Sequence, residues 1–194
     1  SLAELESFVR VELNRVALRR MAVLRPVRLV IDNWPTDADG QPVVEWFELV
    51  NNPENPDDGT RLAPFTGELF IESEDFAEVP PPKFFRLSPG REVRLRGAYL
   101  ITATGVDKDT DGNIVTVHVT YDPAPKGGNA PDGRRVKSTM HWVSARHSVP
   151  ARVALYDRLF TAEVPGEATG DPIDDLNPSS VELLTDCQVE PALA

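Results

Sequence analysis

Short segments in which apolar and polar residues alternate dominate the chain from residue 27 onward. A period of two residues places successive side chains on opposite faces of a β-strand. No helical pattern long enough for a βαβ crossover lies between these segments, which disfavours a doubly wound parallel sheet. The chain is therefore predicted to be mainly β, with barrels or sandwiches as the favoured architectures. The expected strands cover residues 27–31, 43–50, 67–71, 92–103, 114–121, 137–143 and 153–160.

Turn residues mark the connections between the expected strands. Residues 51–59 and 126–133 are rich in Asn, Pro, Asp and Gly and predict loops. Residues 107–113 lie between two long alternating segments and predict the turn of a β-hairpin.

The first residues are the exception to the β pattern. Apolar residues recur near helical spacing from Leu2 to Leu13, and Ser1 is a suitable cap. This spacing predicts one amphipathic helix that ends before residue 20.

The composition is that of a folded protein without a membrane span. The chain has 194 residues, of which 41% are hydrophobic, enough for one large domain or two small ones. It contains no run of about 18 apolar residues, and its first residues lack the shape of a signal peptide. Cys187 is the only cysteine, which is typical of a reducing compartment. We therefore expect a cytoplasmic protein without membrane contact.

Positive and negative charges are segregated along a chain whose formal net charge is −11. Residues 10–28 carry six arginines against one acid, whereas residues 29–82 carry thirteen acids against one arginine. Residues 161–194 carry eight acids and no Lys or Arg. The total charge argues against a protein that coats nucleic acid non-specifically. Basic islands in an acidic field instead suit a bounded, oriented contact with a polyanion.

Residues 83–96 form the second basic island, with five basic residues and two aromatics in fourteen positions. A turn is predicted at Ser88-Pro89-Gly90, and a strand begins at Glu92 and continues through Ala103.

The alternation in this strand places Arg94 and Arg96 together on one face. With Lys83 and Arg86 just across the turn, the two guanidinium groups make a positive pocket for phosphates or the edges of unpaired bases. The alternative is that these arginines pair with cross-strand carboxylates, for which Glu92 is a nearby candidate.

The candidate metal sites in the sequence are incomplete. Residues 107–112 imitate the start of a calcium-binding loop, but His118 occupies the position that needs a glutamate and the flanking segments are strands. The histidines at 118, 141 and 147 lack the close Cys or carboxylate neighbours of a zinc site. We therefore predict no metal.

Catalytic and nucleotide-binding motifs are also missing. Ser144 and His147 are close in sequence, but no Gly-x-Ser-x-Gly elbow accompanies them. The sequence has no Gly-x-x-x-x-Gly-Lys-Ser/Thr loop and no Gly-x-Gly-x-x-Gly after a strand. The residues alone therefore indicate a non-catalytic β-rich module with two arginine clusters.

Five segments, taken in order, resemble the C-terminal half of the bacterial-type glutaminyl-tRNA synthetases, a family of class I aminoacyl-tRNA synthetases. The resemblance covers essentially residues 10–193, and its last segment separates the glutaminyl family from the related glutamyl enzymes. The segments are residues 20–27 (RMAVLRPV), 64–69 (PFTGEL), 90–96 (GREVRLR), 132–137 (DGRRVK) and 141–160 (HWVSARHSVPARVALYDRLF).

The resemblance implies two six-stranded, antiparallel-type β-barrels, proximal and distal to a catalytic body, that hold the unstacked anticodon bases between them. Residues 1–19 are expected to be a helical connector to that body. The proximal barrel is expected at residues 20–54 and 146–194, with some of its strands missing, and the distal barrel at residues 55–145.

The resemblance also implies contacts to the anticodon of glutamine tRNA. Matched by position, Arg19 contacts the middle base, Arg86 the third base, and Arg94 with Arg96 beside it the first base. Lys83 also lies in this anticodon-binding set. Where the family has a Gln and, two residues on, a Lys, this chain has Lys83 and Phe85, and a phenylalanine there can stack on a base.

Motifs of the family's catalytic half are absent from this sequence, which has neither a His-x-Gly-His-like nor a Lys-Met-Ser-Lys-Ser-like motif. The resemblance implies that the parent enzyme ligates glutamine to its tRNA with ATP and magnesium, whereas this chain has no catalytic residues and no cofactor of its own. The expected partners are glutamine tRNA and the catalytic domain of the same enzyme. The residues alone leave open a protein-interaction β module that uses its acidic surface.

Overall fold

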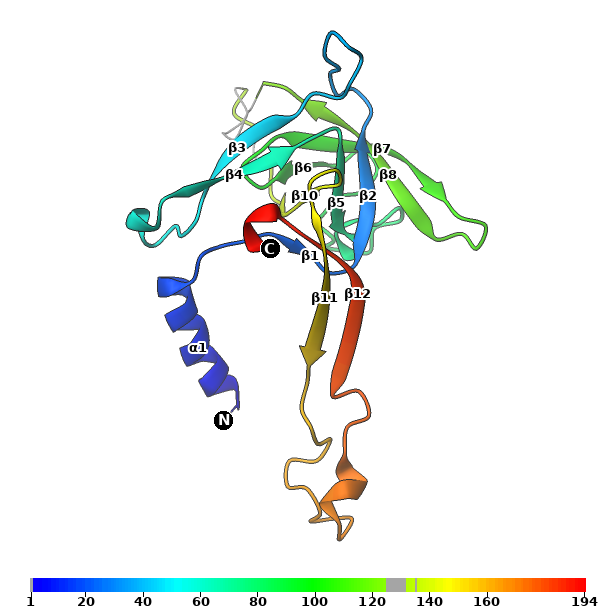
Figure 1. The fold of residues 1–194 in the computed structure, drawn as a ribbon. Helices are drawn as coiled ribbons and strands as arrows, with labels where there is room; N and C mark the ends of the chain where they lie inside the picture. Colours follow the sequence, from blue (N-terminus) through cyan, green and yellow to red (C-terminus); the bar gives the residue numbers. More distant parts are fainter. Residues whose placement is uncertain (1, 125–131, 135) are drawn as a thin grey trace.

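The computed structural model describes residues 2–124, 132–134 and 136–194, and it is mainly β with one short N-terminal helix, α1 (Leu2–Val16) (Figure 1). Short 3₁₀ turns lie at Pro56–Asp58, Ser73–Asp75, Pro172–Asp175 and Pro191–Leu193. The strands are β1 (Ala22–Val23), β2 (Pro26–Ile31), β3 (Glu45–Val50), β4 (Thr60–Phe65), β5 (Glu68–Glu72), β6 (Glu92–Leu95), β7 (Leu100–Lys108), β8 (Ile114–Asp122), β9 (Thr139–Met140), β10 (Val143–Ser144), β11 (Val149–Tyr156) and β12 (Val181–Val189).

A seven-stranded sheet with the order β10-β5-β2-β8-β7-β6-β9 curls into a half-barrel and forms the body of the molecule (Figure 1). Its pairings are antiparallel except for β2 with β8 and β6 with β9. The β3–β4 hairpin packs against this sheet through an aromatic cluster. Phe47 and Phe65 of the hairpin lie 5.4 Å apart, and Phe65 lies 4.8 Å from Trp142, measured between ring centroids. Burying such rings is the main source of stability in a core of this kind.

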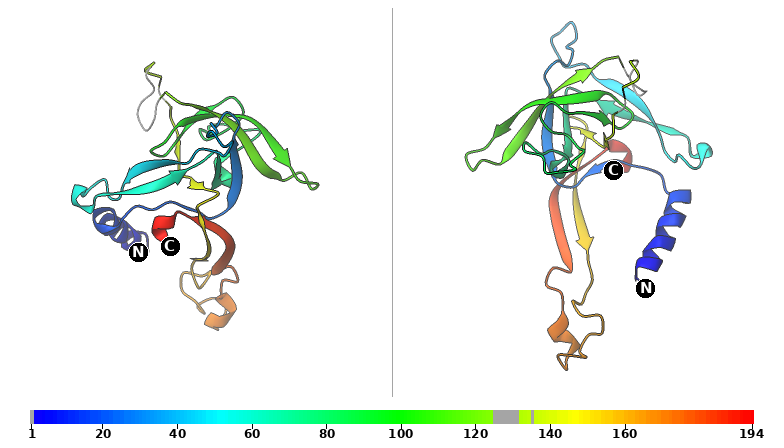
Figure 2. Two further views of the ribbon diagram at one scale, coloured as in Figure 1. Left: turned by 45° about the horizontal axis from the view of Figure 1, so that its top comes forward. Right: turned by 180° about the vertical axis from the view of Figure 1, so that it is seen from behind.

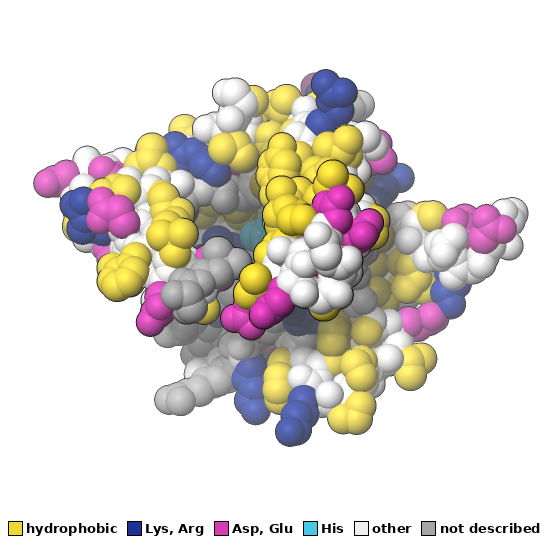
Figure 3. All heavy atoms as spheres, turned by 90° about the horizontal axis from the view of Figure 1, so that it is seen from below, with side chains coloured by type: hydrophobic (Ala, Val, Ile, Leu, Met, Phe, Trp, Pro, Cys, Tyr) yellow, Lys and Arg dark blue, Asp and Glu magenta, His cyan; other side chains and the backbone are white. Residues whose placement is uncertain are grey.

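A second, three-stranded sheet with the order β1-β12-β11 leaves the body as a long ribbon (Figures 1 and 2). Figure 3 shows hydrophobic and acidic side chains gathered on the end of this ribbon, which points toward the viewer. The exposed hydrophobic residues of the connection between β11 and β12 are Leu159, Val164, Ile173 and Leu176.

The structure confirms the predicted N-terminal helix. It ends at Val16, where Ala17 N donates to Leu13 O at 2.8 Å and Asn52 Nδ2 donates to Arg15 O at 2.9 Å. The helix keeps exposed apolar side chains, among them Phe8, and lies apart from the ribbon in every view (Figure 2). No helix among the described residues is long and apolar enough to cross a membrane.

The prediction of one strand over residues 92–103 was wrong, because β6 ends at Leu95 and the chain turns back into β7. Gly97 makes this turn possible with a φ of +66°, and a Cβ there would lie 2.3 Å from Leu49 Cδ2. Ala98 N closes the turn on Leu95 O at 2.9 Å. Arg94 therefore pairs opposite Leu100, and Arg96 stands in the turn itself.

Two of the longer strands were not predicted from the sequence, for different reasons. Strand β4 contains Pro64, which breaks the expected pattern of a strand, and it is tolerated because β4 pairs only with β3. The outer half of β12 pairs with β11 away from the core, so no buried face imposes alternation on its residues.

The hairpin predicted around residues 107–113 is confirmed between β7 and β8. Asp109 shapes its turn, since Oδ1 accepts from Asp111 N at 3.0 Å and from Asn113 N at 2.8 Å. Asp109 and Asp111 are therefore turn residues, whereas Asp107 lies on β7. The loop predicted at residues 126–133 lies mostly outside the described residues.

The strand pairing confirms a mainly β fold but does not resolve it into two six-stranded barrels. Strand β2 lies in the middle of the seven-stranded sheet, between β5 and β8. Strands β1, β11 and β12 form a sheet of their own. The boundaries at residues 19, 54 and 145 stay predictions.

His118 on β8 makes the stability of the fold depend on pH. Its Nδ1 lies 2.8 Å from Asp32 Oδ1 and its Nε2 lies 2.9 Å from Asp107 Oδ2. The hydrogen bond to Asp107, followed by that to Asp32, raises the pKa of His118 above its usual value of 6.5. The protonated ring therefore stabilises the fold fully below pH 6.5, and this contribution disappears as the pH rises through the folded-state pKa.

We expect the difference in unfolding free energy between the unchanged chain and His118→Gln to be below about 1 kcal/mol, because the ion pairs are partly exposed. Urea titrations should show this difference shrinking between pH 6 and pH 9. A His147→Gln variant is the control, since burial lowers the pKa of His147 and reverses the trend. If the difference in unfolding free energy between the unchanged chain and His118→Gln did not change with pH, the stabilising role of protonated His118 would be contradicted.

Candidate nucleic-acid interface

A cleft of ≈ 770 Å³ lies where the end of α1, the β3–β4 hairpin and the turn after β6 meet. It gathers four arginines of an acidic chain, together with a histidine and two glutamates. The lining residues are Arg19, Arg20, Met21, Ala22, Leu24, Glu48, Leu49, Val50, Pro53, Arg61, Glu72, Arg96, Gly97 and His141.

Arg19 is placed in the cleft by the end of the helix. Its Nη1 donates to Ala17 O at 2.8 Å, and its Nη2 donates to Asn14 O at 3.2 Å. The last carbonyl groups of a helix have no partners within the helix, so a guanidinium group binds there readily. The side chain is partly buried and ordered before any ligand arrives.

Two further arginines build the wall of the cleft. Arg20 donates to Ala192 O at 3.1 Å and to Asn51 Oδ1 at 2.8 Å. Arg61 forms a buried ion pair with Glu190, with Nε 2.9 Å from Oε1. The same Oε1 accepts from Met21 N at 2.8 Å, so this carboxylate joins β4 to the segment that carries Arg19 and Arg20.

Arg96 is the exposed cation of the cleft. Its backbone is fixed, since Arg96 N donates to Met140 O at 2.8 Å and its carbonyl accepts from Trp142 Nε1 at 3.0 Å. Its side chain takes part in none of the ion pairs found in the part of the chain that the structure describes. The backbone of Arg96 is therefore fixed while its guanidinium group is exposed, and such a group can donate to a phosphate or to a base edge.

His141 adds a buried nitrogen beside this cleft. Its Nε2 has no hydrogen-bond partner among the described residues and lies 3.6 Å from Glu72 Oε1. The two oxygens of Glu72 accept from Leu24 N at 2.7 Å and Arg25 N at 2.9 Å. This carboxylate therefore fixes the backbone that follows Arg19 and Arg20.

Arg86 is oriented by a carboxylate next to the cleft. Its Nη1 lies 2.5 Å from Asp75 Oδ1, and Asp75 is buried. Burial raises the pKa of Asp75, against the opposing charges of Arg86 and His141. Arg86 is therefore ion-paired, although it lies outside the strands for which pairing with cross-strand carboxylates was considered.

The predicted site residues fall into two groups. Arg19 and Arg96 are brought together in the cleft, whereas Lys83, Arg86 and Arg94 are not among the residues that line it. Lys83 is exposed in a loop, with a φ of +65°, and Arg94 is half-buried on β6.

Sequence reasoning did not select three of the charged or titratable residues that line the cleft, namely Arg20, Arg61 and His141. Arg20 belongs to the N-terminal run of arginines, which was a usable signal. Arg61 was an isolated cation in an acidic segment, and only its pairing with Glu190 explains its position.

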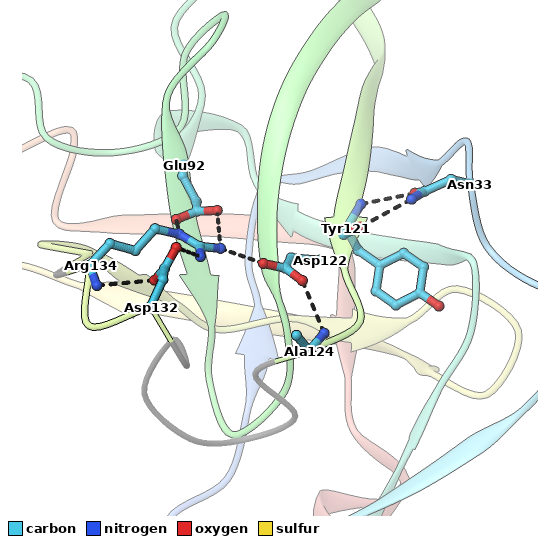
Figure 4. A network of polar contacts seen from close by, with 7 residues as sticks. All are labelled: Asn33, Glu92, Tyr121, Asp122, Ala124, Asp132 and Arg134. Atoms are coloured by element: carbon cyan, nitrogen blue, oxygen red, sulfur yellow. Dashed lines mark hydrogen bonds and ion pairs between the residues drawn. The ribbon is translucent and has the colours of Figure 1, made fainter.

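Glu92, the predicted partner for the strand arginines, is bound by Arg134 (Figure 4). Arg134 Nε lies 2.7 Å from Glu92 Oε1, and its other nitrogens reach Asp122 and Asp132. These contacts tie β6 and the end of β8 to the segment at 132–134. Backbone and Arg134 hydrogen bonds lower the pKa values of Asp122 and Asp132.

Ser144 and His147 do meet, with Oγ and Nδ1 3.0 Å apart, but Ser144 is buried and also contacts Thr66 Oγ1 at 3.1 Å. The contact between these two side chains therefore supports the turn that follows Ser144, in which His147 N and Ser148 N donate to Ser144 O. In the ranges that the structure covers, no group of three or more His, Cys, Asp or Glu side chains could hold a metal ion.

Comparisons with known proteins agree with the resemblance seen in the sequence. A family model described as "tRNA synthetases class I (E and Q), anti-codon binding domain" matches residues 17–122, and a second model of the same description matches residues 139–194. The chain is 55% identical over 190 residues to a protein of Nitrobacter winogradskyi named glutamine–tRNA ligase. Proteins of the same name from Rhodopirellula baltica and Pseudomonas putida are 51% and 47% identical over 192 and 195 residues.

These alignments cover 98% of this chain for the Nitrobacter and Rhodopirellula proteins and 100% for the Pseudomonas protein. They cover 33%, 31% and 33% of the respective relatives, so the chain spans about one third of their length.

Proposed function

This chain belongs to the anticodon-binding domains of the class I tRNA synthetases for glutamate and glutamine, and from this membership we propose that it reads the anticodon of glutamine tRNA. The protein of which it is a part would ligate glutamine to that tRNA. ATP and magnesium would act in the catalytic domain of the same protein, and this chain would need no cofactor. Such a protein would work in the cytoplasm.

The observation that carries the proposal is the arginine-lined cleft in a chain with a net charge of −11. An acidic surface repels RNA, so RNA can approach closely only where cations are concentrated. Unpaired bases expose their hydrogen-bonding edges, and proteins read them in single-stranded loops such as an anticodon. The cleft offers ordered guanidinium groups for that purpose.

We assign the base contacts by position in the family. Arg19 would contact the middle base, and Arg94 and Arg96 would contact the first base. Arg86 would contact the third base, with Lys83 nearby. The ion pair with Asp75 supports this role for Arg86, because it orients the guanidinium group before RNA binds.

The two-barrel organisation is part of the same proposal. Residues 1–19 would connect to the catalytic body, residues 20–54 and 146–194 would form the proximal barrel, and residues 55–145 the distal barrel. The separate β1-β12-β11 sheet supports a unit that contains residues from both ends of the chain.

Filter binding tests the proposal directly. The chain should retain glutamine tRNA more strongly than a glutamine tRNA that is altered only in its anticodon. Each lost base-edge contact should cost roughly 1–3 kcal/mol of binding free energy. Equal retention of both tRNAs, or retention of neither, would instead favour a protein-interaction module whose arginines serve only in ion pairs.

A further inference from the structure

Three consecutive residues, Met140, His141 and Trp142, connect the two sides of the arginine-lined cleft. On the first side, Met140 O accepts from Arg96 N at 2.8 Å, and Trp142 Nε1 donates to Arg96 O at 3.0 Å. Met140 and Trp142 are only 2% and 1% exposed, so the core holds both residues in place. The backbone of Arg96 is therefore fixed to the two neighbours of His141.

The ring of His141 reaches the second side of the cleft. Its Nε2 is buried and lies 3.6 Å from Glu72 Oε1. Glu72 is the last residue of β5, and its carboxylate accepts from Leu24 N and Arg25 N, a few residues after Arg19. A chain of contacts therefore runs from one side of the cleft to the other through His141.

The contact between His141 and Glu72 is incomplete in the structure. A distance of 3.6 Å is longer than a hydrogen bond, and Nε2 has no other partner among the described residues. This nitrogen must carry a hydrogen, since a lone pair that faces a carboxylate oxygen is repelled. A buried N–H group without an acceptor costs free energy, which is recovered when a small movement brings the two groups within hydrogen-bond distance.

We propose that His141 is a positioning residue that couples the two sides of the cleft. When RNA draws either Arg96 or Arg19 toward a base, the ring closes on Glu72, and the closed contact places the other arginine as well. Two sites that bias the same two-state element are coupled, and the coupling is reciprocal. This role rests on the proposed function, to which it adds the means by which two base contacts support each other.

Two substitutions separate the hydrogen bond of His141 from the volume of its ring. His141→Phe keeps a flat ring but removes the N–H group, and it should weaken binding of glutamine tRNA by about 3- to 10-fold, the contribution of one hydrogen bond. His141→Gln retains an amide N–H group and should recover most of this affinity. His118→Phe is the matched control and should leave tRNA binding unchanged, because the His118 side chain is similarly exposed, 30% against 34%, but lies outside the cleft.

Discrimination between anticodons shows whether His141 couples the two arginines. Binding is measured for glutamine tRNA and for two variants of it, altered only at the first or only at the middle anticodon base. Arg96→Ala should reduce discrimination mainly at the first base and Arg19→Ala mainly at the middle base, whereas His141→Phe should reduce both by a similar factor. These measurements distinguish a coupling residue from one that contacts a single base.

A double-mutant cycle measures the coupling itself. In the otherwise unchanged chain, the loss of affinity for glutamine tRNA in the double variant Arg19→Ala/Arg96→Ala should be smaller than the product of the two single losses, by at least about 2-fold. In a His141→Phe background the two losses should multiply. Circular dichroism at the temperature of the binding measurements checks that each variant is folded.

The coupling role is overturned if His141→Phe binds and discriminates as the unchanged chain does, or if His141→Gln loses as much affinity as His141→Phe. A loss of discrimination at one base alone would mean that the ring contacts that base, and an equal loss for all three tRNAs would mean a structural role only. Either result overturns the coupling. Should His141→Phe fail to fold, single losses for Arg19→Ala and Arg96→Ala that simply multiply in the unchanged chain overturn it by themselves.

The unchanged chain distinguishes a failure of this role from a failure of the proposed function. If it discriminates the anticodon while the coupling is absent, the proposed function stands and only the role of His141 falls. If it binds all three tRNAs equally, or none of them, both fall.

Discussion

Replacing Glu190 by alanine should lower the free energy of unfolding by about 3–5 kcal/mol. Glu190 and Arg61 form an ion pair whose side chains are only 3% and 9% exposed. The substitution would leave the guanidinium charge of Arg61 buried without its carboxylate, and it would also remove the acceptor of Met21 N. Equilibrium unfolding in urea, followed by circular dichroism, measures the loss.

Glu182→Ala is the matched control for this prediction. Glu182 pairs with Arg25 at 2.9 Å, but both side chains are about half exposed, so its removal should lower the free energy of unfolding far less than Glu190→Ala does. Similar losses for Glu190→Ala and Glu182→Ala would show that the buried pair contributes nothing special. Because Glu190 also anchors the segment after α1, Glu190→Ala should weaken tRNA binding under conditions in which the variant remains folded.

Arg94→Ala and Arg96→Ala should each weaken binding of glutamine tRNA by roughly 5- to 150-fold, which corresponds to a loss of about 1–3 kcal/mol for a base-edge contact. For a tRNA altered at the first anticodon base, the same substitutions should reduce the affinity much less, because this tRNA already lacks that contact. Arg96 lines the cleft and Arg94 precedes it on β6, so the pair tests whether one or both read the base. Titrations with both tRNAs at one salt concentration measure the effect.

Arg28→Ala controls for the loss of a positive charge. Arg28 lies on β2, is exposed, and pairs with Glu68 outside the cleft. The Arg94 and Arg96 variants could reduce the affinity for both tRNAs by the same factor, or by no more than Arg28→Ala does. In that case the two arginines would only attract the tRNA by their charge and would not read a base.

The alternation in residues 92–95 shows how far a local pattern can predict structure. The alternation that places Arg94 on one face places Val93 and Leu95 on the other, and both of these residues are completely buried. The pattern did not reveal where the strand ends, because that depends on Gly97 and its contact with Leu49, a residue of another hairpin. Arg96 consequently lies in a turn, and the expected row of two arginines on one strand is not formed.

The sequence alone determined the mainly β class, the single N-terminal helix and the family, because periodicity, turn residues and matched segments are properties of neighbouring residues. It also located the two basic islands. The tertiary structure decided which cations share a cleft, because Arg19, Arg61, Arg96 and His141 meet only through strand pairings between distant segments. It likewise distinguished Glu190 and Asp175 from the other acids of residues 161–194, since burial depends on what packs around a side chain and leaves no local pattern in the sequence.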